Sequence, residues 1–320
     1  MTAFLDAVRR ESEELAAWVD GLPVEGPDVP FPDADDLPDA LLDLSVPHDD
    51  VNDIVAAHRS APELAGLRDR CAWEVLSGLG PVYDGNARLR PLPPSFGAAG
   101  RLLAVFVAVA VAPHTVRHNS ALGIAPAVTY RSLADVGRQV AKHRRRYGVA
   151  GVLTPYWLGN ALRGQLFELG RLQFQRAVLD TRTGAAAGHP GRLCLDLHIP
   201  DFRGPLTPSA CDRSIDAAHA FFATHFPAEK PAVATCHSWL LDRHLAARLP
   251  PGSNITAFQR RFTSAYDAET PTDADLLDFV FDDPTLPLDQ LPRDTTLRRV
   301  VLDHLSAGGH WYEGNGWFAW

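Results

Sequence analysis

The chain has 320 residues, of which 46% are hydrophobic and 22% are charged. This is the composition of a globular protein long enough to form two domains, and it excludes a disordered or fibrous chain. The formal net charge of −9 argues against a broad phosphate-binding surface, so nucleic acid is not an expected partner. The basic run at residues 142–146 could attract a phosphate-bearing donor or a tRNA. A solvated helix end beside the negative end of the helix dipole is the favoured interpretation.

Cysteine spacing and apolar runs indicate a cytoplasmic protein without a metal site or a membrane segment. The four cysteines have no short paired spacing, which excludes a zinc ribbon and a thioredoxin-like motif, so reduced thiols are expected. The N-terminal segment, positions 1–20, is amphipathic and acidic, without the apolar core of a signal peptide. The longest apolar run, residues 102–112, is about half of the roughly 20 residues that a membrane span needs, and it predicts a buried helix.

The N-terminal part of the chain, positions 1–148, is predicted to form a helical domain. Apolar residues recur there at helical spacing in several segments. Residues 21–38 contain too many prolines and aspartates for regular structure, which predicts a surface loop or a partly mobile segment. The expected helices cover residues 2–20, 51–58, 62–79, 100–112 and 132–147.

After residue 148 the pattern changes to strands alternating with helices, which predicts a mixed α/β domain over residues 149–320 and an α+β protein overall. Residues 192–199 (RLCLDLHI) alternate strictly, so that Cys194, Asp196 and His198 share one face of a strand. A second strand is expected at residues 232–241 (AVATCHSWLL). The other expected elements are helices at 154–162, 208–226, 253–262 and 295–305, a helix or turn at 242–249, strand-like segments at 165–179 and 276–281, a hairpin-type loop at 184–191, and a glycine- and tryptophan-rich tail.

Several short motifs stand out in the sequence. The string CHSWLL at residues 236–241 is unusual, and it is accompanied by LGRLQF at 169–174, HIP at 198–200, SNI at 253–255 and LP at 291–292. With these motifs the chain resembles, over nearly its whole length, a bacterial, largely actinobacterial, family of N-acyltransferases. The resemblance implies an all-α N-terminal domain followed by a GNAT-like mixed sheet, and transfer of an acyl group from a thioester to an amine.

By this resemblance, the strands at 192–199 and 232–241 would splay around the pantetheine arm of the donor, with Leu197 and Thr235 beside it. The helix from Pro208 would hold the pyrophosphate at its N-terminus, with Arg203 and Gly204 in the preceding loop. That loop departs from the GNAT pattern, because residues 201–208 contain one glycine and two prolines, and proline has no N–H donor. Acetyl-CoA is the leading donor that the resemblance implies, but this departure leaves an acyl group on a carrier protein and an aminoacyl donor open as alternatives.

The base that takes a proton from the attacking amine is expected among three residues. His198 ends the alternating strand and Asp196 shares its face, so the two could act on one ligand or one water. The alternative is that His198 caps the strand end and bonds to the next loop. Glu168, in the strand-like segment, is the other candidate, because a carboxyl in a sheet interior has a raised pKa. Its alternative is an exposed strand carboxylate.

The CHSWLL strand supplies further candidates for substrate binding. Cys236 and His237 are adjacent, so their side chains point to opposite faces and cannot form a nucleophile–base pair. Cys236 shares a face with Ser238, and a lining role is favoured over a covalent acyl-cysteine because a buried free cysteine is usually a small apolar residue. His237 is a candidate substrate-site residue.

Aromatic residues could complete the acceptor pocket. Tyr156 and Trp157 are candidates for its lining, and the aromatic tail is expected to fold back onto the body and shape the same pocket. The helix expected at 253–262 contains no tyrosine. An acid for the leaving thiolate would then be Tyr266, Tyr312 or water.

The leading function is N-acyl transfer, most plausibly of an acetyl group from CoA, to a small amine by direct attack. The alternatives are aminoacyl transfer from a charged tRNA and a GNAT-like binding or sensor module without catalysis. The expected partners are the small-molecule acceptor and an acyl carrier protein, with no metal and no membrane.

Overall fold

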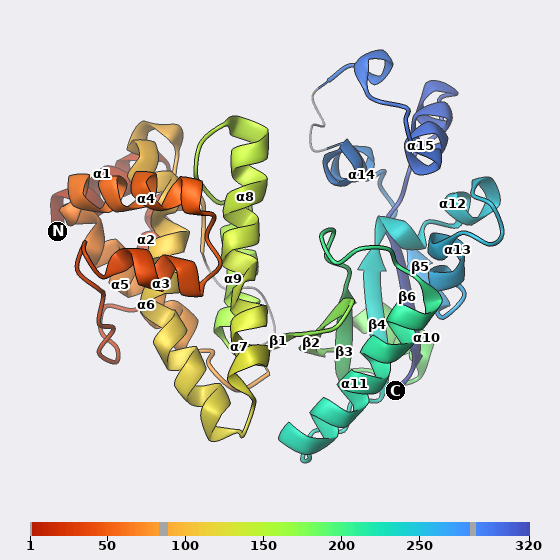
Figure 1. Ribbon diagram of the computed structural model, residues 1–320, viewed down its shortest axis with the longest axis horizontal. Coiled ribbons are helices and arrows are strands. Elements are labelled where there is room, and N and C mark those ends of the chain that lie inside the picture. The colour runs from red at the N-terminus through yellow and green to blue at the C-terminus, as the bar shows by residue number, and fades with distance from the viewer. Residues whose placement is uncertain (1, 83–88, 282–285) are drawn as a thin grey trace. The chain divides into compact units, whose positions relative to one another are not determined.

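The computed structural model of the chain describes residues 2–82, 89–281 and 286–320, and it divides into two compact units (Figure 1). The first unit covers residues 1–167 and the second covers residues 168–320. This division lies later than the predicted boundary at residue 148. The reason is that α9 (Pro155–Leu162) packs on α6 (Gly97–Ala121), α7 (Pro126–Leu133) and α8 (Asp135–Tyr147) of the helical unit.

Every regular element that the structure describes before Leu166 is a helix, as the sequence predicts. The helix expected at residues 2–20 is two helices, because Ser12 has an extended backbone and its Oγ accepts a hydrogen bond from Leu15 N, which starts a new helix. The remaining elements of this unit are α1 (Thr2–Glu11), α2 (Glu13–Gly21), α3 (Leu37–Asp43), α4 (His48–Ser60), η1 (Pro62–Leu64), α5 (Ala65–Leu76) and η2 (Pro94–Phe96).

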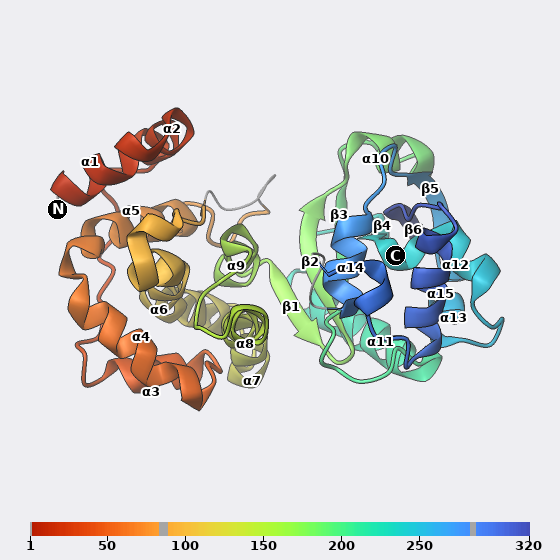
Figure 2. The same ribbon diagram turned by 90° about the horizontal axis from the view of Figure 1, so that it is seen from above.

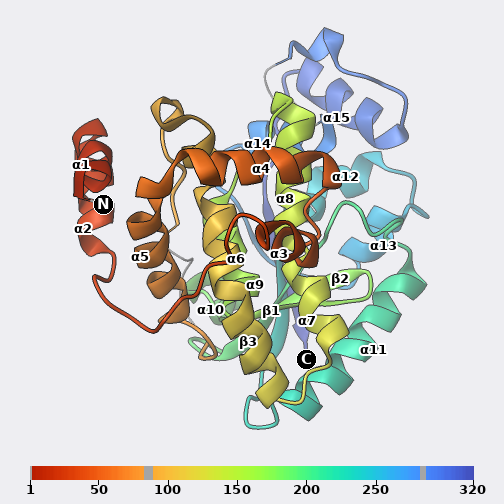
Figure 3. The same ribbon diagram turned by 60° about the vertical axis from the view of Figure 1, so that its left-hand side comes forward.

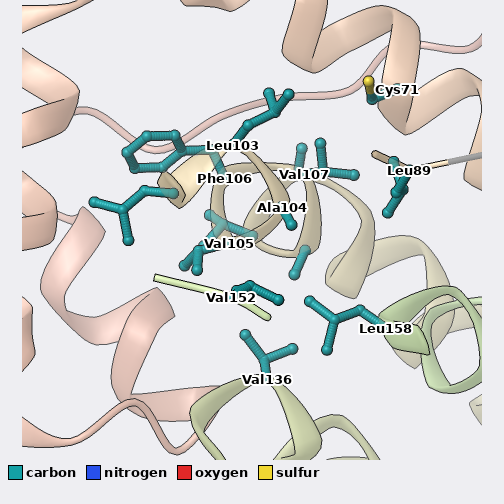
Figure 4. Packing of buried hydrophobic residues seen from close by; sticks show 14 of the residues in the cluster. Cys71, Leu89, Leu103, Ala104, Val105, Phe106, Val107, Val136, Val152 and Leu158 are labelled. Carbon is teal, nitrogen blue, oxygen red and sulfur yellow. The ribbon is translucent and has the colours of Figure 1, made fainter. Parts of the chain in front are cut away.

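Helix α6 forms the centre of the helical unit. The segment Pro94–Ala121 is long and apolar enough to cross a membrane, and it extends well past both ends of the helix expected at 100–112. Residues 102–111 are buried, and Phe106 and Val107 pack among side chains of the neighbouring helices and loops (Figure 4). Helix α4 crosses α6 (Figure 3). This helix is therefore the core of the unit, as its apolar run predicts.

The proline-rich stretch before α3 is an ordered loop held by side chains of α5. Arg70 donates to the carbonyl oxygens of Leu22 and Pro23 at 2.7 and 2.9 Å, and Trp73 Nε1 donates to Pro27 O at 2.9 Å. These bonds satisfy carbonyls that have no helical partner. Of the two expectations for residues 21–38, the surface loop is the one observed.

The second unit contains a mixed six-stranded sheet with the order β1-β2-β3-β4-β6-β5, and β1 begins two residues before the division (Figure 1). β3 and β4 are parallel, whereas β2–β3, β4–β6 and β5–β6 are antiparallel. The strands are β1 (Leu166–Leu169), β2 (Leu172–Val178), β3 (Leu193–His198), β4 (Val233–Ser238), β5 (Thr263–Asp267) and β6 (Gly314–Ala319). The helices are α10 (Thr181–Ala187), α11 (Pro208–His225), η3 (Trp239–Leu241), α12 (Arg243–Arg248), α13 (Asn254–Gln259), α14 (Asp273–Phe281), η4 (Leu288–Gln290) and α15 (Thr296–Ser306).

One expectation for this unit was wrong, and another was confirmed only in part. Residues 184–191 lie in the connection between the antiparallel strands β2 and β3, as a hairpin requires, but residues 184–187 belong to α10, which Asp180 caps by accepting hydrogen bonds from Arg182 N and Thr183 N at 2.9 Å. Residues 276–281 are not a strand. They complete α14, whose Leu276 and Leu277 are buried in an apolar cluster with α12 and α15. A short apolar run fits either element, and the acidic first turn favours the helix.

Two strands, β5 and β6, were not expected from the sequence. β6 is formed by the glycine-rich tail and lies between β4 and β5, so the tail does fold back onto the body. A Cβ at Gly314 would meet the Leu241 main chain at 2.6 Å, and one at Gly316 would meet Phe262 Cβ at 2.9 Å. These glycines therefore permit a close approach that side chains would prevent.

Helices cover both faces of the sheet. Figure 2 shows α10 and α11 on opposite sides of it. On the α11 face, Phe174 of β2 meets Phe222 of the helix with ring centroids 6.5 Å apart. On the α10 face, Cys194 and Val233 form a small apolar cluster at the start of β3 and β4. Beyond this cluster the same face becomes polar.

Candidate active site

The two central strands separate near their carboxyl ends. Their parallel ladder ends at Asp196–Thr235, although β3 continues to His198 and β4 to Ser238. Each strand remains paired with its outer neighbour to its end. Along these fully described strands, no pairing joins β3 to β4 beyond Asp196. The inner edges of the two strands, which face each other there, are therefore not hydrogen-bonded to each other in the ladder, and this opening is called the slot. A splay was expected at these two strands.

Strand pairing brings polar side chains together on the α10 face beside the slot. Residues opposite each other on neighbouring strands point to the same face. The register aligns residues of four strands in this way, and none of the pairs is close in sequence. This polar stripe consists of Gln173, Gln175, Asp196, His198, Thr235, His237 and Asn315.

His198 lies at the edge of the slot with its ring held by two oxygens. Its Nε2 is 2.9 Å from Gln175 Oε1 and 3.7 Å from Asp196 Oδ2, and about a fifth of the side chain (21%) is exposed. The other Asp196 oxygen accepts a hydrogen bond from Thr235 Oγ1 at 2.9 Å. Because both neighbours of Nε2 are oxygens, the proton of the neutral ring lies on Nε2, and Nδ1 carries the basic lone pair.

His237 is the second histidine of the stripe. Its Nδ1 is hydrogen-bonded to Asn315 Oδ1, and its Nε2 is 3.9 Å from Asp180 Oδ2 at the N-terminus of α10. Burial disfavours the imidazolium. The carboxylates of Asp196, Asp180 and Glu313 and the Asn315 side chain outweigh burial, and they raise the pKa of His237 above its ordinary value.

The two carboxyls next to His237 differ in their environment. Burial raises the pKa of Glu313, and Asp275 and Asp196 add to this effect against the opposing charge of His237. For Asp180 burial acts in the same direction. The hydrogen bonds from the first turn of α10 and the charge of His237 nevertheless lower the pKa of Asp180. The site therefore holds carboxyls of different proton affinity around one imidazole.

Comparison with known proteins agrees with this geometry. A model of the N-acyltransferase N-terminal domain matches residues 35–164, and a model of the GNAT-like C-terminal domain matches residues 166–318. The chain belongs to this family of acyltransferases. A search of curated proteins gave no match.

Solved structures of acyltransferases are similar to this acyltransferase over nearly its full length. One, in complex with decanoyl-CoA and teicoplanin, is 35% identical, with 98% of this chain and 99% of that chain covered and a TM-score of 0.89. A mutant acyltransferase with octanoyl-CoA is 34% identical over the same shares, with a TM-score of 0.87. A third, with CoA and 10C-teicoplanin, has the same identity, coverage and TM-score as the mutant.

The loop between β3 and α11 of the acyltransferase contains the residues expected to bind the donor phosphates. Arg203 forms an ion pair with Glu168 of β1, and Gly204 has a φ of 73°. Glu168 is fully buried, so it is not the exposed strand carboxylate that the sequence left open. This buried carboxylate has the Arg203 guanidinium as an ion-pair partner.

Two arginines that the sequence did not single out lie near the start of α11. Arg171, in the turn between β1 and β2, is 9% exposed, and Nη1 donates to Pro200 O at 2.9 Å. Its Nε has no hydrogen-bond partner in the described structure, and burial lowers the pKa of this guanidinium. Arg261 donates to Pro208 O at 3.1 Å and pairs with Asp212. Arg171 belongs to the LGRLQF motif, but its position beside the helix, like that of Arg261, follows only from the folded structure.

The other residues expected in the acyltransferase site are buried or are hydrogen-bonded to neighbouring protein groups. Cys236 is fully buried on the α11 face, and burial raises the pKa of its thiol well above the ordinary value, which disfavours a nucleophilic thiolate. Ser238 Oγ accepts from Leu240 N and caps η3. The Leu197 side chain is buried, so only its main chain borders the slot, whereas Thr235 holds Asp196.

The aromatic candidates separate between the two units. Tyr156 and Trp157 belong to α9 of the helical unit, where Tyr156 is exposed and Trp157 Nε1 donates to Asp135. Tyr266 of β5 lies opposite Asn315. Burial and the charge of Asp180 raise its pKa. In the described ranges, no group of three or more His, Cys, Asp or Glu side chains is arranged to hold a metal ion.

Two stripe residues, Gln175 and Asn315, also escaped the sequence interpretation. Both are neutral amides, which carry no chemistry of their own, and each becomes meaningful only through the histidine opposite or diagonal to it. Period-two alternation in residues 172–178 places Gln173 and Gln175 on one face and was the available signal. Asn315 has a glycine on each side, and because glycine is uncommon in strands, the sequence did not predict a strand there.

Proposed function

We propose that this enzyme transfers the acyl group of a CoA thioester to an amine of a small molecule. The observation that carries the proposal is the end of the β3–β4 ladder at Asp196–Thr235, with His198 directly beyond it. A thioester arm in this slot would lie beside main-chain groups that the β3–β4 ladder does not use, and it would meet the imidazole of His198 at the end of β3. A direct attack fits better than a covalent route, because the Cys236 thiol stays protonated.

In the proposed reaction His198 acts as the general base. Its Nδ1 takes a proton from the acceptor ammonium, and the amine nitrogen then attacks the thioester carbonyl carbon. The carbon–nitrogen bond forms, the carbon–sulfur bond breaks, and the electron pair leaves with the CoA sulfur. The attacking nitrogen then loses its second proton to the leaving thiolate, directly or through water, which gives the neutral amide and the CoA thiol, and the imidazolium releases the first proton to the solvent. Gln175 and Asp196 hold the ring so that Nε2 remains the protonated nitrogen.

The donor phosphates are assigned to the start of α11. The N-terminus of α11 has the positive end of the helix dipole, although Pro208 has no N–H and the N–H groups of Ala210 and Cys211 are bonded to Thr207. Arg171 adds a buried guanidinium that donates to the neutral Pro200 carbonyl and whose Nε has no hydrogen-bond partner in the described structure; the charge of Asp201 acts on it but does not offset the effect of burial. Because Arg203 forms an ion pair with Glu168, we assign the contact with the donor phosphates to Arg171 and not to Arg203, which the loop sequence had suggested.

The acyl chain is proposed to reach beyond acetyl. The similar acyltransferases bound octanoyl-CoA and decanoyl-CoA, and one was solved with the glycopeptide teicoplanin. These ligands support a medium-chain donor and a small-molecule acceptor larger than a simple amine. The four cysteines are buried and free, which is consistent with the proposed cytoplasmic location.

The test is a matrix of donors and acceptors. Acetyl-, octanoyl- and decanoyl-CoA, and an acylated carrier protein, are combined with teicoplanin-type aglycones and with simple amines. Release of the CoA thiol is measured with a chromogenic disulfide reagent, and the acylated product is identified by mass spectrometry. N-acylated product with a CoA donor supports the proposal. Transfer from the carrier protein alone, or thiol release without an amide product, overturns it.

A further inference from the structure

Asp196 stands between the two histidines of the polar stripe. One oxygen is 3.7 Å from His198 Nε2, and the other accepts the Thr235 hydroxyl. On the next strand, His237 follows Thr235 by two residues on the same face, and Asp196 is the strongest of the charges that act on it. A single carboxylate thus serves two imidazole rings.

Each ring nitrogen of His237 faces an oxygen atom, through a hydrogen bond at Nδ1 and an ion-pair contact of 3.9 Å at Nε2. Asn315, which is 6% exposed and does not titrate, holds Nδ1 through its amide oxygen. Asp180 faces Nε2, and it is itself fixed by the first-turn N–H groups of α10. A ring with an acceptor at each nitrogen suits the imidazolium, which has two donors. Because neither partner is mobile, the cation keeps one orientation.

We propose that His237 is a positioning residue whose imidazolium balances the charge of Asp196 beside the His198 base. The proposal rests on the proposed function, in which His198 must be neutral to take a proton. An unbalanced Asp196 would stabilise the protonated form of His198 and so withdraw the base at neutral pH. Loss of the His237 charge should therefore raise the pH at which His198 becomes active.

Several elements contribute groups that face His237, and their summed charge favours its cationic form. Carboxylates come from three directions, and the tyrosine of β5 is neutral because burial and Asp180 raise its pKa. Arg182 stacks on that tyrosine ring at 3.8 Å and so offsets part of the Asp180 charge. The groups are Asp196 of β3, Asp180 before α10, Glu313 before β6, Asn315 of β6 and Tyr266 of β5.

The experiment compares His237→Gln, Asn315→Ala and Asp196→Asn with the wild-type enzyme. Histidine-labelled NMR follows the His198 ring through pH 4–9 without turnover, and the pH profile of kcat/KM is measured in parallel. His198→Gln identifies the resonance. His189→Gln, which removes an exposed histidine from the turn after α10, is the matched control and should change neither measurement.

Removal of His237 should move the titration midpoint of His198 and the acidic limb of the pH profile up by about 0.5–1.5 pH units, the effect of losing one charge on the facing strand across the slot. At pH 6.5 kcat/KM should then fall about 3- to 30-fold, with a much smaller change on the alkaline plateau. Asn315→Ala should shift the limb in the same direction by less, and Asp196→Asn in the opposite direction.

Two outcomes separate this inference from the proposed function. If His198 titrates as described but no acyl transfer occurs, the charge balance stands and the proposed reaction is refuted. If transfer occurs and the His237→Gln limb does not move, His237 is only structural and the inference fails. If His237→Gln does not fold, the other variants decide. The inference is then refuted if the acidic limb of the kcat/KM profile lies at the same pH in Asn315→Ala, Asp196→Asn and wild type.

Discussion

Replacement of Arg171 by methionine should weaken donor binding without weakening the fold. The side chain is 9% exposed, and its single hydrogen bond in the described structure goes to a neutral carbonyl, that of Pro200. Burial of a guanidinium without a carboxylate partner is costly, so the substitution removes an unfavourable desolvation together with one hydrogen bond. The two effects oppose each other, and the unfolding free energy of the ligand-free enzyme should change by no more than about 1 kcal/mol.

Donor affinity should respond much more strongly. A hydrogen bond between charged groups contributes about 1.5–3 kcal/mol, which corresponds to about a 10- to 150-fold change in Kd. Calorimetry with CoA measures this change directly, and urea unfolding with and without CoA measures the ligand-dependent stabilisation. Arg192→Met is the matched control, because this exposed arginine precedes β3 at the end opposite the slot.

Two results would contradict a role of Arg171 in donor binding. A variant that is strongly destabilised and yet binds CoA as tightly as wild type would show that Arg171 only joins the β1–β2 turn to Pro200. Equal losses of CoA affinity in the Arg171 and Arg192 variants would show a general charge effect.

Four further predictions concern single residues. His198→Ala should lower kcat by about 10²- to 10⁴-fold with donor Kd within twofold, and His198→Gln should not restore it; full activity would make His198 structural. Cys236→Ala should keep kcat within about threefold, and the native thiol should resist iodoacetamide at pH 8; rapid inactivation by labelling would contradict this. Arg203→Met should cost about 3 kcal/mol in urea unfolding, because it removes a guanidinium that pairs with the fully buried Glu168 carboxylate. Glu168→Gln should cost less, because 37% of the Arg203 side chain already reaches solvent; the reverse order would refute the argument. Asp180→Ala should lower stability by about 1 kcal/mol through loss of the α10 cap, and Asp180→Asn should retain most of it.

The strands that form the slot could be predicted because their own residues specify them. The alternation around Asp196 and His198 gives both the strand and its polar face, and Pro200 marks its end. Helix α11 was equally clear from Thr207, whose hydroxyl accepts from Ala210 N, and from Pro208 at its first turn. Where local signals agree with the fold, the sequence is sufficient.

The remaining parts depend on contacts distant in sequence. β6 has glycines at positions where most strands have side chains, and the reason lies in Leu241 and Phe262, which approach them closely. The pairing of His237 with Asn315 joins residues 78 positions apart. No periodicity within either segment encodes that contact, so the site could be predicted as two strands and two histidines but not as a connected stripe.

The position of β6 in the sheet has a consequence for biosynthesis. Of the six described strands, β6 is the last in the sequence, yet it lies between β4 and β5 and contributes Asn315 to the site. Until residues 314–319 emerge from the ribosome, β5 has no neighbouring strand, and the edge of β4 that pairs with β6 in the complete sheet is exposed as a template for other strands. Closure of the long segment that separates Ser238 from Gly314 makes this a late event in folding. A nascent chain that stalls shortly before the tail would therefore carry a folded helical unit followed by an aggregation-prone, incomplete sheet.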